Sequence, residues 1–236
     1  AHGVFGMSAI TSVTAQNTTG VYGVFDIDYE FVGKQIDVVF EDIIPDSVKI
    51  GMVSNADIIK TIACHLEKNK AKNIVLDPVM VSTSGCMLLQ SEAKNALINE
   101  LIPLASIITP NISEAEVLSD ITINNEDDMI KAAEKIYEKT RKSILIKGGH
   151  LSSSADDLLF TSEGIKWYKA IRIDNNNTHG TGCTLSSAIA CNLAKGYNME
   201  QSVENGKKYV YTAINAKLNL GNGDGPLWHN VEGFSK

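Results

Sequence analysis

Short runs of aliphatic and β-branched residues alternate along this chain with longer segments of helical period. The strand-like runs are Met7–Gln16, Val48–Met52, Ile74–Asp77, Ile107–Thr109 and Ile144–Lys147. The helix-like segments between them are Glu30–Ile44, Asn55–Asn69, Ser91–Leu101 and Glu126–Lys139. Strand-then-helix repetition with connections of this length is typical of a parallel sheet covered by helices on both faces. The sequence therefore predicts an α/β fold with three layers and a mostly parallel central sheet.

The last third of the chain departs from this alternation. Leu158–Phe160 and Ile165–Ile173 flank the turn residues Ser162–Gly164, a pattern that predicts an antiparallel hairpin at an edge of the sheet. Two amphipathic helical segments follow the hairpin. The sequence contains no repeat, low-complexity tract or linker, so we predict a single domain over residues 1–236.

Composition excludes several classes of function. The chain carries 21 Lys and Arg against 28 Asp and Glu, a formal charge of −7, and its basic residues do not cluster. We therefore expect no binding to nucleic acid or to an anionic membrane. No run approaches the roughly 18 apolar residues of a transmembrane helix. The four cysteines lack both Cys-x-x-Cys spacing and the density of a disulfide scaffold, which favours reduced thiols in the cytoplasm.

The strongest chemical signal is the segment Asn177–Thr184, which reads Asn-Thr-His-Gly-Thr-Gly-Cys-Thr and leads into a helix. Gly180 and Gly182 let the backbone turn sharply and expose consecutive N–H groups. Those donors and the helix dipole favour an anion such as a transferring phosphate. Cys183 falls in the first helical turn, where a thiolate is favoured. The pattern equally fits a glycine-punctuated helix start with an inert cysteine, because Gly-x-Gly alone is a weak motif.

Two charged residues end predicted strands, at the edge where open α/β sheets bind their ligands. Asp77 suits a magnesium ion, and it equally suits a turn before Pro78. Lys147 precedes two glycines and can reach toward phosphates, although a solvated lysine at a strand end is at least as common. No P-loop sequence is present, so any ATP must bind in another way.

Three further polar residues fall near the same edge. Asn111 and Glu114 match a helix capping box, which is compatible with a metal or phosphate role for Glu114. Gln16 closes the first predicted strand. Its amide has donors and an acceptor that match the edge of a heteroaromatic ring with an amino group, and hydrogen bonding within a turn is the alternative.

Taken together in chain order, six segments resemble hydroxymethylpyrimidine/phosphomethylpyrimidine kinases, the thiamin-biosynthetic branch of the ribokinase-like superfamily. The segments are Thr14–Thr18, Lys49–Met52, Leu76–Met80, Thr109–Glu114, Lys147–His150 and Asn177–Thr184. Each motif is modest, but six in the same order are specific. The resemblance implies a ribokinase-like fold and magnesium-dependent transfer of a phosphoryl group from ATP. The implied acceptors are 4-amino-5-hydroxymethyl-2-methylpyrimidine and then its monophosphate, which becomes the pyrophosphate.

The resemblance also implies residue roles and a homodimer. The implied residues are Gln16, Met52 and Val79 for the pyrimidine; Asn111, Lys147 and Thr178 for the nucleotide; Asp77 and Glu114 for magnesium; and Gly180, Thr181, Gly182 and Cys183 for catalysis, with Cys183 as the candidate base.

The chain departs from the family pattern at its start. Members of the family begin with a strand and a Gly-rich segment whose Asp closes over the pyrimidine, and no such segment precedes Val4. We therefore expect N-terminal residues, including that strand and loop, to be absent from this sequence. A pyridoxal or pyridoxine kinase, or an enzyme with both activities, is the nearest alternative, although the Cys of Gly-Thr-Gly-Cys favours the thiamin branch. A non-catalytic module that binds a pyrimidine or a nucleotide is the alternative from another class.

Overall fold

The structure is a computed structural model that describes residues 1–80, 91–149, 156–170, 173, 175, 177–218 and 220–231. The described residues form two compact units. The first unit lies within residues 1–49, 64–73 and 173–236, and the second lies within residues 50–63 and 74–172. The prediction of a single domain over the whole chain stays a prediction. Cys86 and His150 lie outside the described residues.

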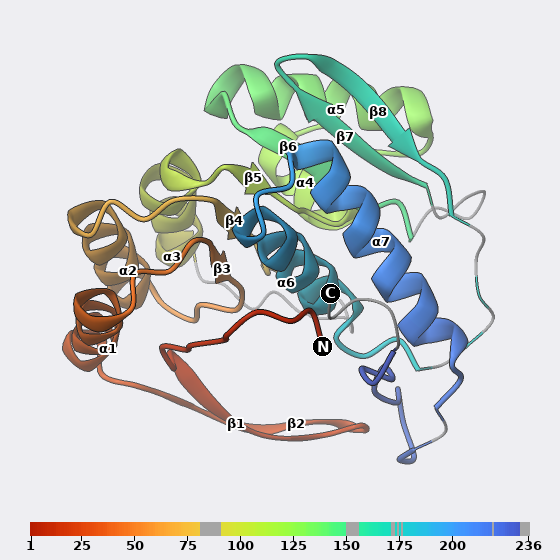
Figure 1. Cartoon of the computed structure of the whole chain (residues 1–236). Coiled ribbons are helices and arrows are strands. Elements are labelled where there is room, and N and C mark those ends of the chain that lie inside the picture. Colours follow the sequence, from red (N-terminus) through yellow and green to blue (C-terminus); the bar gives the residue numbers. More distant parts are fainter. Residues whose placement is uncertain are drawn as a thin grey trace. The chain divides into compact units, whose positions relative to one another are not determined.

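A six-stranded sheet forms the centre of the second unit, with the strand order β3-β4-β5-β6-β7-β8 (Figure 1). Strands β4, β5 and β6 run parallel, whereas β7 and β8 are antiparallel to their neighbours. The mostly parallel sheet and its antiparallel edge hairpin are therefore confirmed. The strands are β3 (Val48–Ile50), which enters this unit at Ile50, β4 (Ile74–Leu76), β5 (Ile107–Ile108), β6 (Ser143–Ile146), β7 (Asp157–Thr161) and β8 (Gly164–Tyr168).

The parallel strands are short and apolar because both of their faces are buried. Every side chain of β4 and β5 is buried, as are the last three of β6. Strands of this kind have continuous runs of apolar residues instead of alternating ones. This is why the sequence alone located them to within one or two residues.

The helices of the second unit are α3 (Ser91–Ala96), α4 (Ile112–Ser119), α5 (Glu126–Thr140) and the first part of α2 (Ala56–Lys68). Three of them fall within the predicted segments Asn55–Asn69, Ser91–Leu101 and Glu126–Lys139 or extend one residue beyond them, and α4 begins after the predicted capping residue Asn111. After α3 the chain continues through a π-helical turn, Leu97–Leu101, and a 3₁₀ turn, Ile102–Leu104. Pro103 has no backbone N–H to donate, which explains why regular α-helix does not continue there. No helix in the described residues is both long and apolar enough to cross a bilayer.

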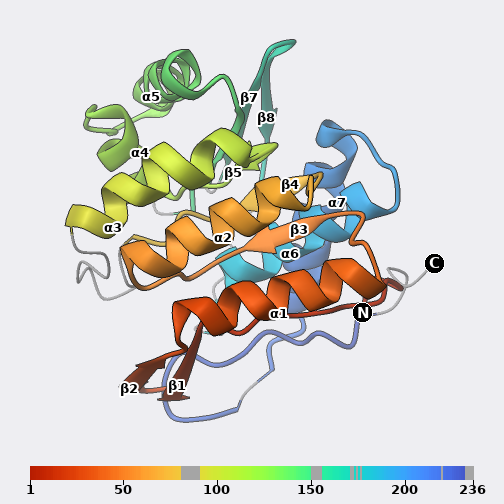
Figure 2. The same cartoon turned by 90° about the vertical axis from the view of Figure 1, so that its left-hand side faces the viewer.

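An antiparallel ribbon opens the first unit and corrects one prediction. The expected strand Met7–Gln16 is in fact β1 (Ser12–Asn17), which pairs only with β2 (Gly20–Asp26) in a separate two-stranded sheet (Figure 2). Residues that favour extended backbone predict a strand but do not identify its partner, and here the turn at Thr18 and Thr19 brings a local partner within reach. Strand β2 was not predicted.

Three helices complete the first unit, together with the end of α2. They are α1 (Tyr29–Asp42), α6 (Thr181–Ala194) and α7 (Met199–Asn215). Helices α6 and α7 pack against each other (Figure 1). Their close approach depends on Gly206, because a Cβ atom there would lie 3.2 Å from Ile189 and 3.3 Å from Leu185. The predicted pair of C-terminal helices is confirmed.

Within the first unit, α1 meets the end of α2 at a glycine. A Cβ atom on Gly33 would lie 2.5 Å from Nε2 of His65. The imidazole cannot easily move away, because its Nδ1 lies 2.8 Å from Oδ1 of Asp37. Lys68, His65 and Asn69 all contact this carboxylate, which holds the pKa of Asp37 well below its usual value.

The substitution Gly33→Ala is expected to destabilise the protein by about 1 kcal/mol. Overpacking lowers the free energy of unfolding by about 1–3 kcal/mol. The higher helix propensity of alanine offsets about 1 kcal/mol of this loss. Urea unfolding measures the difference. In a His65→Ala background the clash is gone, so the same change should be stabilising. Stabilisation by Gly33→Ala in the unmodified protein would contradict this account of the helix contact.

Candidate active site

The segment 180–183 in the first unit, which we call the anion seat, has the geometry that the sequence predicted. Gly180 is the N-cap of α6 and adopts a left-handed conformation, with φ of 79°, that favours glycine. Among the residues that the structure describes, no side chain caps this helix. Thr181 N–H donates to the carbonyl of Thr178, and Thr184 N–H donates to the carbonyl of Gly180.

The backbone amides of Gly182 and Cys183, which lie between Thr181 and Thr184, are available to a ligand. Within the described residues, the N–H groups of Gly182 and Cys183 have no hydrogen-bond partner. The thiol of Cys183 is exposed beside them. Unpartnered amides at the positive end of a helix dipole are suited to an anion. The anion seat is therefore accessible and chemically competent to hold a phosphate.

Gln16 reaches the residue that precedes the anion seat. Its Nε2 lies 3.3 Å from Nε2 of His179. The pairing register of β1 and β2 shifts between Ala15 and Gln16. Bulges of this kind re-aim a side chain and are common next to active sites. The side chain of Gln16 is thus held at the anion seat, and not at the end of a strand in the parallel sheet as predicted.

A C-terminal loop, residues 220–226, connects these two segments within the first unit. The hydroxyl of Thr18 accepts from the N–H groups of Asn222 and Gly223, and His179 N–H donates to the carbonyl of Gly225. Cβ atoms on Gly221 and Gly223 would collide with Thr18, and one on Gly225 would collide with Asn177. The glycines at alternate positions in this loop were the signal for such a close approach, and the sequence analysis had not assigned them a role.

Asp77 and Lys147 form a buried ion pair in the second unit. Their side chains follow β4 and β6, and Lys147 Nζ lies 2.8 Å from Oδ1 of Asp77. The exposed fractions of the side chains are 2% for Asp77 and 16% for Lys147. The hydroxyl of Thr109, which follows β5, also donates to Oδ1 at 3.3 Å. The sequence suggested Asp77 and Lys147 separately, but it gave no indication that they contact each other.

Asn111 and Glu114 form the predicted capping box at the start of α4. Asn111 Oδ1 accepts from Glu114 N–H, and Glu114 Oε2 accepts from Asn111 N–H. Burial raises the pKa of Glu114, and repulsion from Asp77 adds to this effect. Lys147 and the backbone donors of Asn111 and Met80 oppose it. The structural role of the box is confirmed, while a metal role for Glu114 stays a prediction.

The two buried carboxylates fit a divalent cation that keeps most of its water. Glu114 and Asp77 repel each other, and Lys147 compensates only one negative charge. Magnesium typically takes one or two protein carboxylates and completes its shell with water and substrate phosphates. No cluster of three or more His, Cys, Asp or Glu side chains that could hold a metal is present in the described part of the chain. The donor set therefore suits a magnesium ion that arrives with a nucleotide, and not a protein-enclosed metal.

Three predicted site residues remain, namely Met52, Val79 and Thr178. Met52 follows β3 and is exposed, and Val79 N–H donates to the carbonyl of Asp77. Thr178 is exposed and accepts from both the N–H and the hydroxyl of Thr181. The contact of His179 with Gln16 was not predicted, because no local pattern marks a partner 163 residues away.

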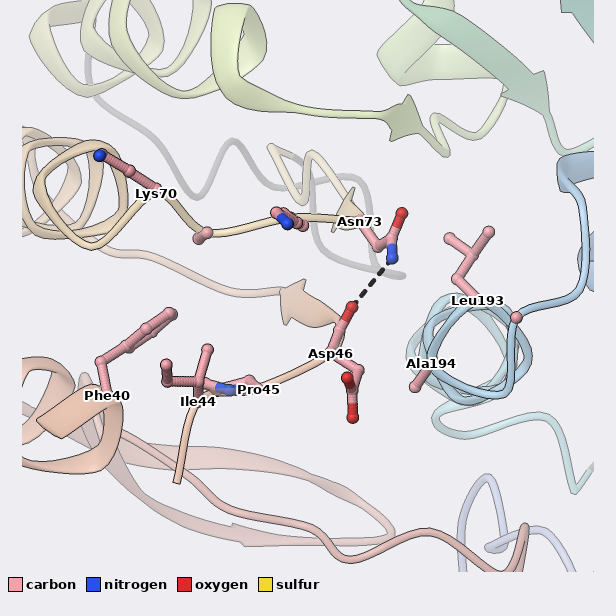
Figure 3. Close-up of a pocket in the computed structure, with 11 residues that line it drawn as sticks. Phe40, Ile44, Pro45, Asp46, Lys70, Asn73, Leu193 and Ala194 are labelled. Carbon is pink, nitrogen blue, oxygen red and sulfur yellow. Dashed lines mark hydrogen bonds between the residues drawn. The ribbon is translucent and has the colours of Figure 1, made fainter. Parts of the chain in front are cut away.

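A separate hollow of about 350 Å³ lies elsewhere in the first unit (Figure 3). Asn73 closes one side of it by donating to the carbonyl of Asp46 at 2.9 Å. The lining residues are Phe40, Ile44, Pro45, Asp46, Lys70, Ala71, Lys72, Asn73, Leu193, Ala194 and Gly196. Because this lining includes no residue of the anion seat and none of the other predicted site residues, we assign the hollow no part in the chemistry.

Comparison with known proteins gives a consistent set of relatives. The family model described as phosphomethylpyrimidine kinase matches residues 1–228. A hydroxymethylpyrimidine/phosphomethylpyrimidine kinase of Rhizobium meliloti (strain 1021) is 46% identical over 231 residues, which cover 96% of this chain and 86% of the relative.

Solved structures show the same likeness. A phosphomethylpyrimidine kinase from Clostridium difficile 630 has a TM-score of 0.81 and 49% identity, and the match covers 90% of this chain and 87% of the other. Bacillus subtilis pyridoxal kinase, solved as an ADP complex, has a TM-score of 0.88 and 35% identity, with 96% and 86% covered. These neighbours confirm the predicted ribokinase-like fold, and the nucleotide in the second agrees with the predicted use of ATP.

Proposed function

This chain belongs to the phosphomethylpyrimidine kinase family, and we propose that it phosphorylates 4-amino-5-hydroxymethyl-2-methylpyrimidine and then its monophosphate with ATP, for thiamin biosynthesis. The observation that carries the proposal is the open pair of amides at Gly182 and Cys183. Phosphoryl transfer asks mainly for alignment and for stabilisation of charge on the transferring group. Preorganised N–H donors at a helix start supply that stabilisation.

The anion seat takes the transferring phosphoryl group in this proposal. The amides of Gly182 and Cys183 donate to its oxygens, and the left-handed Gly180 gives the backbone the turn that exposes them. Thr181 keeps the first turn closed through its bond to Thr178, a residue that the family resemblance assigns to the nucleotide. Cys183 is the candidate base for the proton of the attacking hydroxymethyl group.

The charged cluster of the second unit serves the nucleotide. Lys147 neutralises phosphate charge, and the NH₂ end of Asn111 donates to a phosphate while its carbonyl caps α4. Asp77 and Glu114 are the residues that would hold magnesium. When bound, that ion neutralises charge on the β- and γ-phosphates.

Gln16, Met52 and Val79 are assigned to the pyrimidine ring. The amide of Gln16 supplies the polar recognition, and the other two side chains supply apolar contact. The homodimer implied by the family resemblance and the cytoplasmic location stay predictions.

An ATP-consumption assay on the full-length protein tests the proposal. It compares the aminopyrimidine alcohol, its monophosphate and pyridoxal at equal concentrations. We expect both pyrimidines to be phosphorylated with a kcat/KM at least about tenfold above that of pyridoxal, the discrimination available from about one hydrogen bond. Turnover of pyridoxal alone would select the pyridoxal kinase alternative, and binding of the pyrimidine without ATP turnover would select the binding module.

A further inference from the structure

The contact between Gln16 and His179 joins two segments that the proposed reaction needs together. Their Nε2 atoms lie 3.3 Å apart, and both side chains are exposed. The carbonyl end of the Gln16 amide lies on the other side, where Oε1 is 3.5 Å from the hydroxyl of Thr14. The amide is therefore contacted at both ends, with its NH₂ group toward the imidazole.

The backbone of His179 is held by the C-terminal loop, and this limits where its imidazole can lie. His179 N–H donates to the carbonyl of Gly225, and His179 forms a parallel bridge with Pro226. The same loop binds the turn of the β1–β2 ribbon through Thr18, two residues after Gln16. The C-terminal loop thus sets the distance between the Gln16 amide and the His179 ring.

We propose that His179 is a positioning residue that fixes the orientation of the Gln16 amide and so determines which ring the site accepts. In the neutral tautomer that carries its proton on Nδ1, His179 Nε2 is an acceptor. It takes one N–H of the Gln16 amide, which prevents the amide from rotating by 180°. The other N–H and the carbonyl oxygen then lie along one edge, available to a ligand.

That edge is complementary to an aminopyrimidine. The remaining N–H of Gln16 donates to a ring nitrogen, and the carbonyl oxygen accepts from the adjacent amino group. An amide of Gln16 rotated by 180° would place its NH₂ group, and not its carbonyl oxygen, opposite the amino group of the ligand. That amino group would then have no acceptor, and unmet polar groups in a site cost binding. The pyridoxal ring has no amino group beside a ring nitrogen. His179 therefore favours the aminopyrimidine over rings that lack this donor–acceptor pair.

This inference rests on the proposed function, and kinetics on two His179 variants test it. His179→Leu removes the acceptor, so the KM for the aminopyrimidine alcohol should rise about tenfold, as expected for one lost hydrogen bond, while the KM for ATP stays within about twofold. His179→Gln restores an acceptor oxygen and should return the KM to within about threefold of the unmodified enzyme. The same alcohol without its amino group should show no such dependence on residue 179.

A second pair of variants separates positioning from other roles. If His179 acts through Gln16, then His179→Leu should add little to the effect of Gln16→Ala in a double-mutant cycle. Because both side chains are exposed, all variants should keep their melting temperature within about 2 °C. Equal losses for the amino and the amino-free substrate, additive effects in the cycle, or no rescue by glutamine would overturn the proposal.

Calorimetric titration of the aminopyrimidine without ATP distinguishes this inference from the proposed function. If the protein binds the ring but does not turn it over, the kinase proposal fails, and the affinity of the His179→Leu variant still tests the positioning role. If the aminopyrimidine neither binds nor reacts, both proposals are overturned. Phosphorylation of pyrimidines with no change in His179→Leu would leave the kinase proposal intact and overturn only the inference.

Discussion

Replacing Cys183 with alanine is expected to slow the first phosphorylation about 100- to 10,000-fold, the usual contribution of a positioned base, and to slow the second much less. The two acceptors differ in their need for a base. A hydroxymethyl group must lose its proton as it attacks, whereas a phosphate monoester has a second pKa near ~6 and is already mostly dianionic at neutral pH. Single-turnover rates with the alcohol and with its monophosphate measure the two steps separately.

Cys64→Ala is the matched control for this experiment. Cys64 is also a free, exposed cysteine, but it lies on α2, and its removal should leave both rates unchanged. Equal losses in the two steps after Cys183→Ala would show that this residue positions the acceptor or shapes the anion seat instead of taking a proton.

The substitution Lys147→Met is expected to lower the kcat/KM for ATP about 100- to 1,000-fold, which is typical for loss of one preorganised charge-stabilising group. It should also destabilise the protein by about 3–5 kcal/mol, because Asp77 remains buried without its cation. Loss of Lys147 should raise the pKa of Glu114 further, since this ammonium group opposes the effect of burial. Steady-state kinetics and urea unfolding give the two main measurements.

Two comparisons separate the catalytic loss from the loss of stability. Lys147→Met combined with Asp77→Asn removes both charges, so stability should largely return, while the kcat/KM for ATP should stay below that of Asp77→Asn alone, which lacks only the carboxylate assigned to magnesium. Lys131→Met breaks a lysine–aspartate pair on the surface of α5, where the lysine side chain is 64% exposed, and it should cost less than about 1 kcal/mol and no activity. Recovery of activity together with stability in the double variant would show that Lys147 acts on the fold and not on the nucleotide.

Local patterns account for the parts of the structure that were predicted correctly. The capping box of Asn111 and Glu114 joins residues three apart in the sequence, so a short window contains the whole interaction. The buried strands are visible as continuous apolar runs for the same reason. The left-handed Gly180 at the start of α6 also belongs to this class, because only the local backbone conformation is involved.

The strand expected at Met7–Gln16 shows that local sequence patterns do not predict which strand pairs with which. A run of β-branched residues predicts extended backbone, and the same run suits a strand of the central sheet or an isolated ribbon. The partner of β1 is β2, with a register shift between Ala15 and Gln16, and the side chain of Gln16 contacts His179. No sequence pattern distinguishes the pairing of β1 with β2, or the contact of Gln16 with His179, from a strand in the central sheet.

The sequence by itself determined the class of fold, the helix start at Gly180 and the family, because each of these depends on residues that are neighbours in the chain or on motifs in a fixed order. Only the tertiary structure decided that Lys147 pairs with Asp77, 70 residues away, and that His179 meets Gln16, 163 residues away. Contacts over such separations depend on the path of the chain through space, and the identities of the two residues do not encode that path.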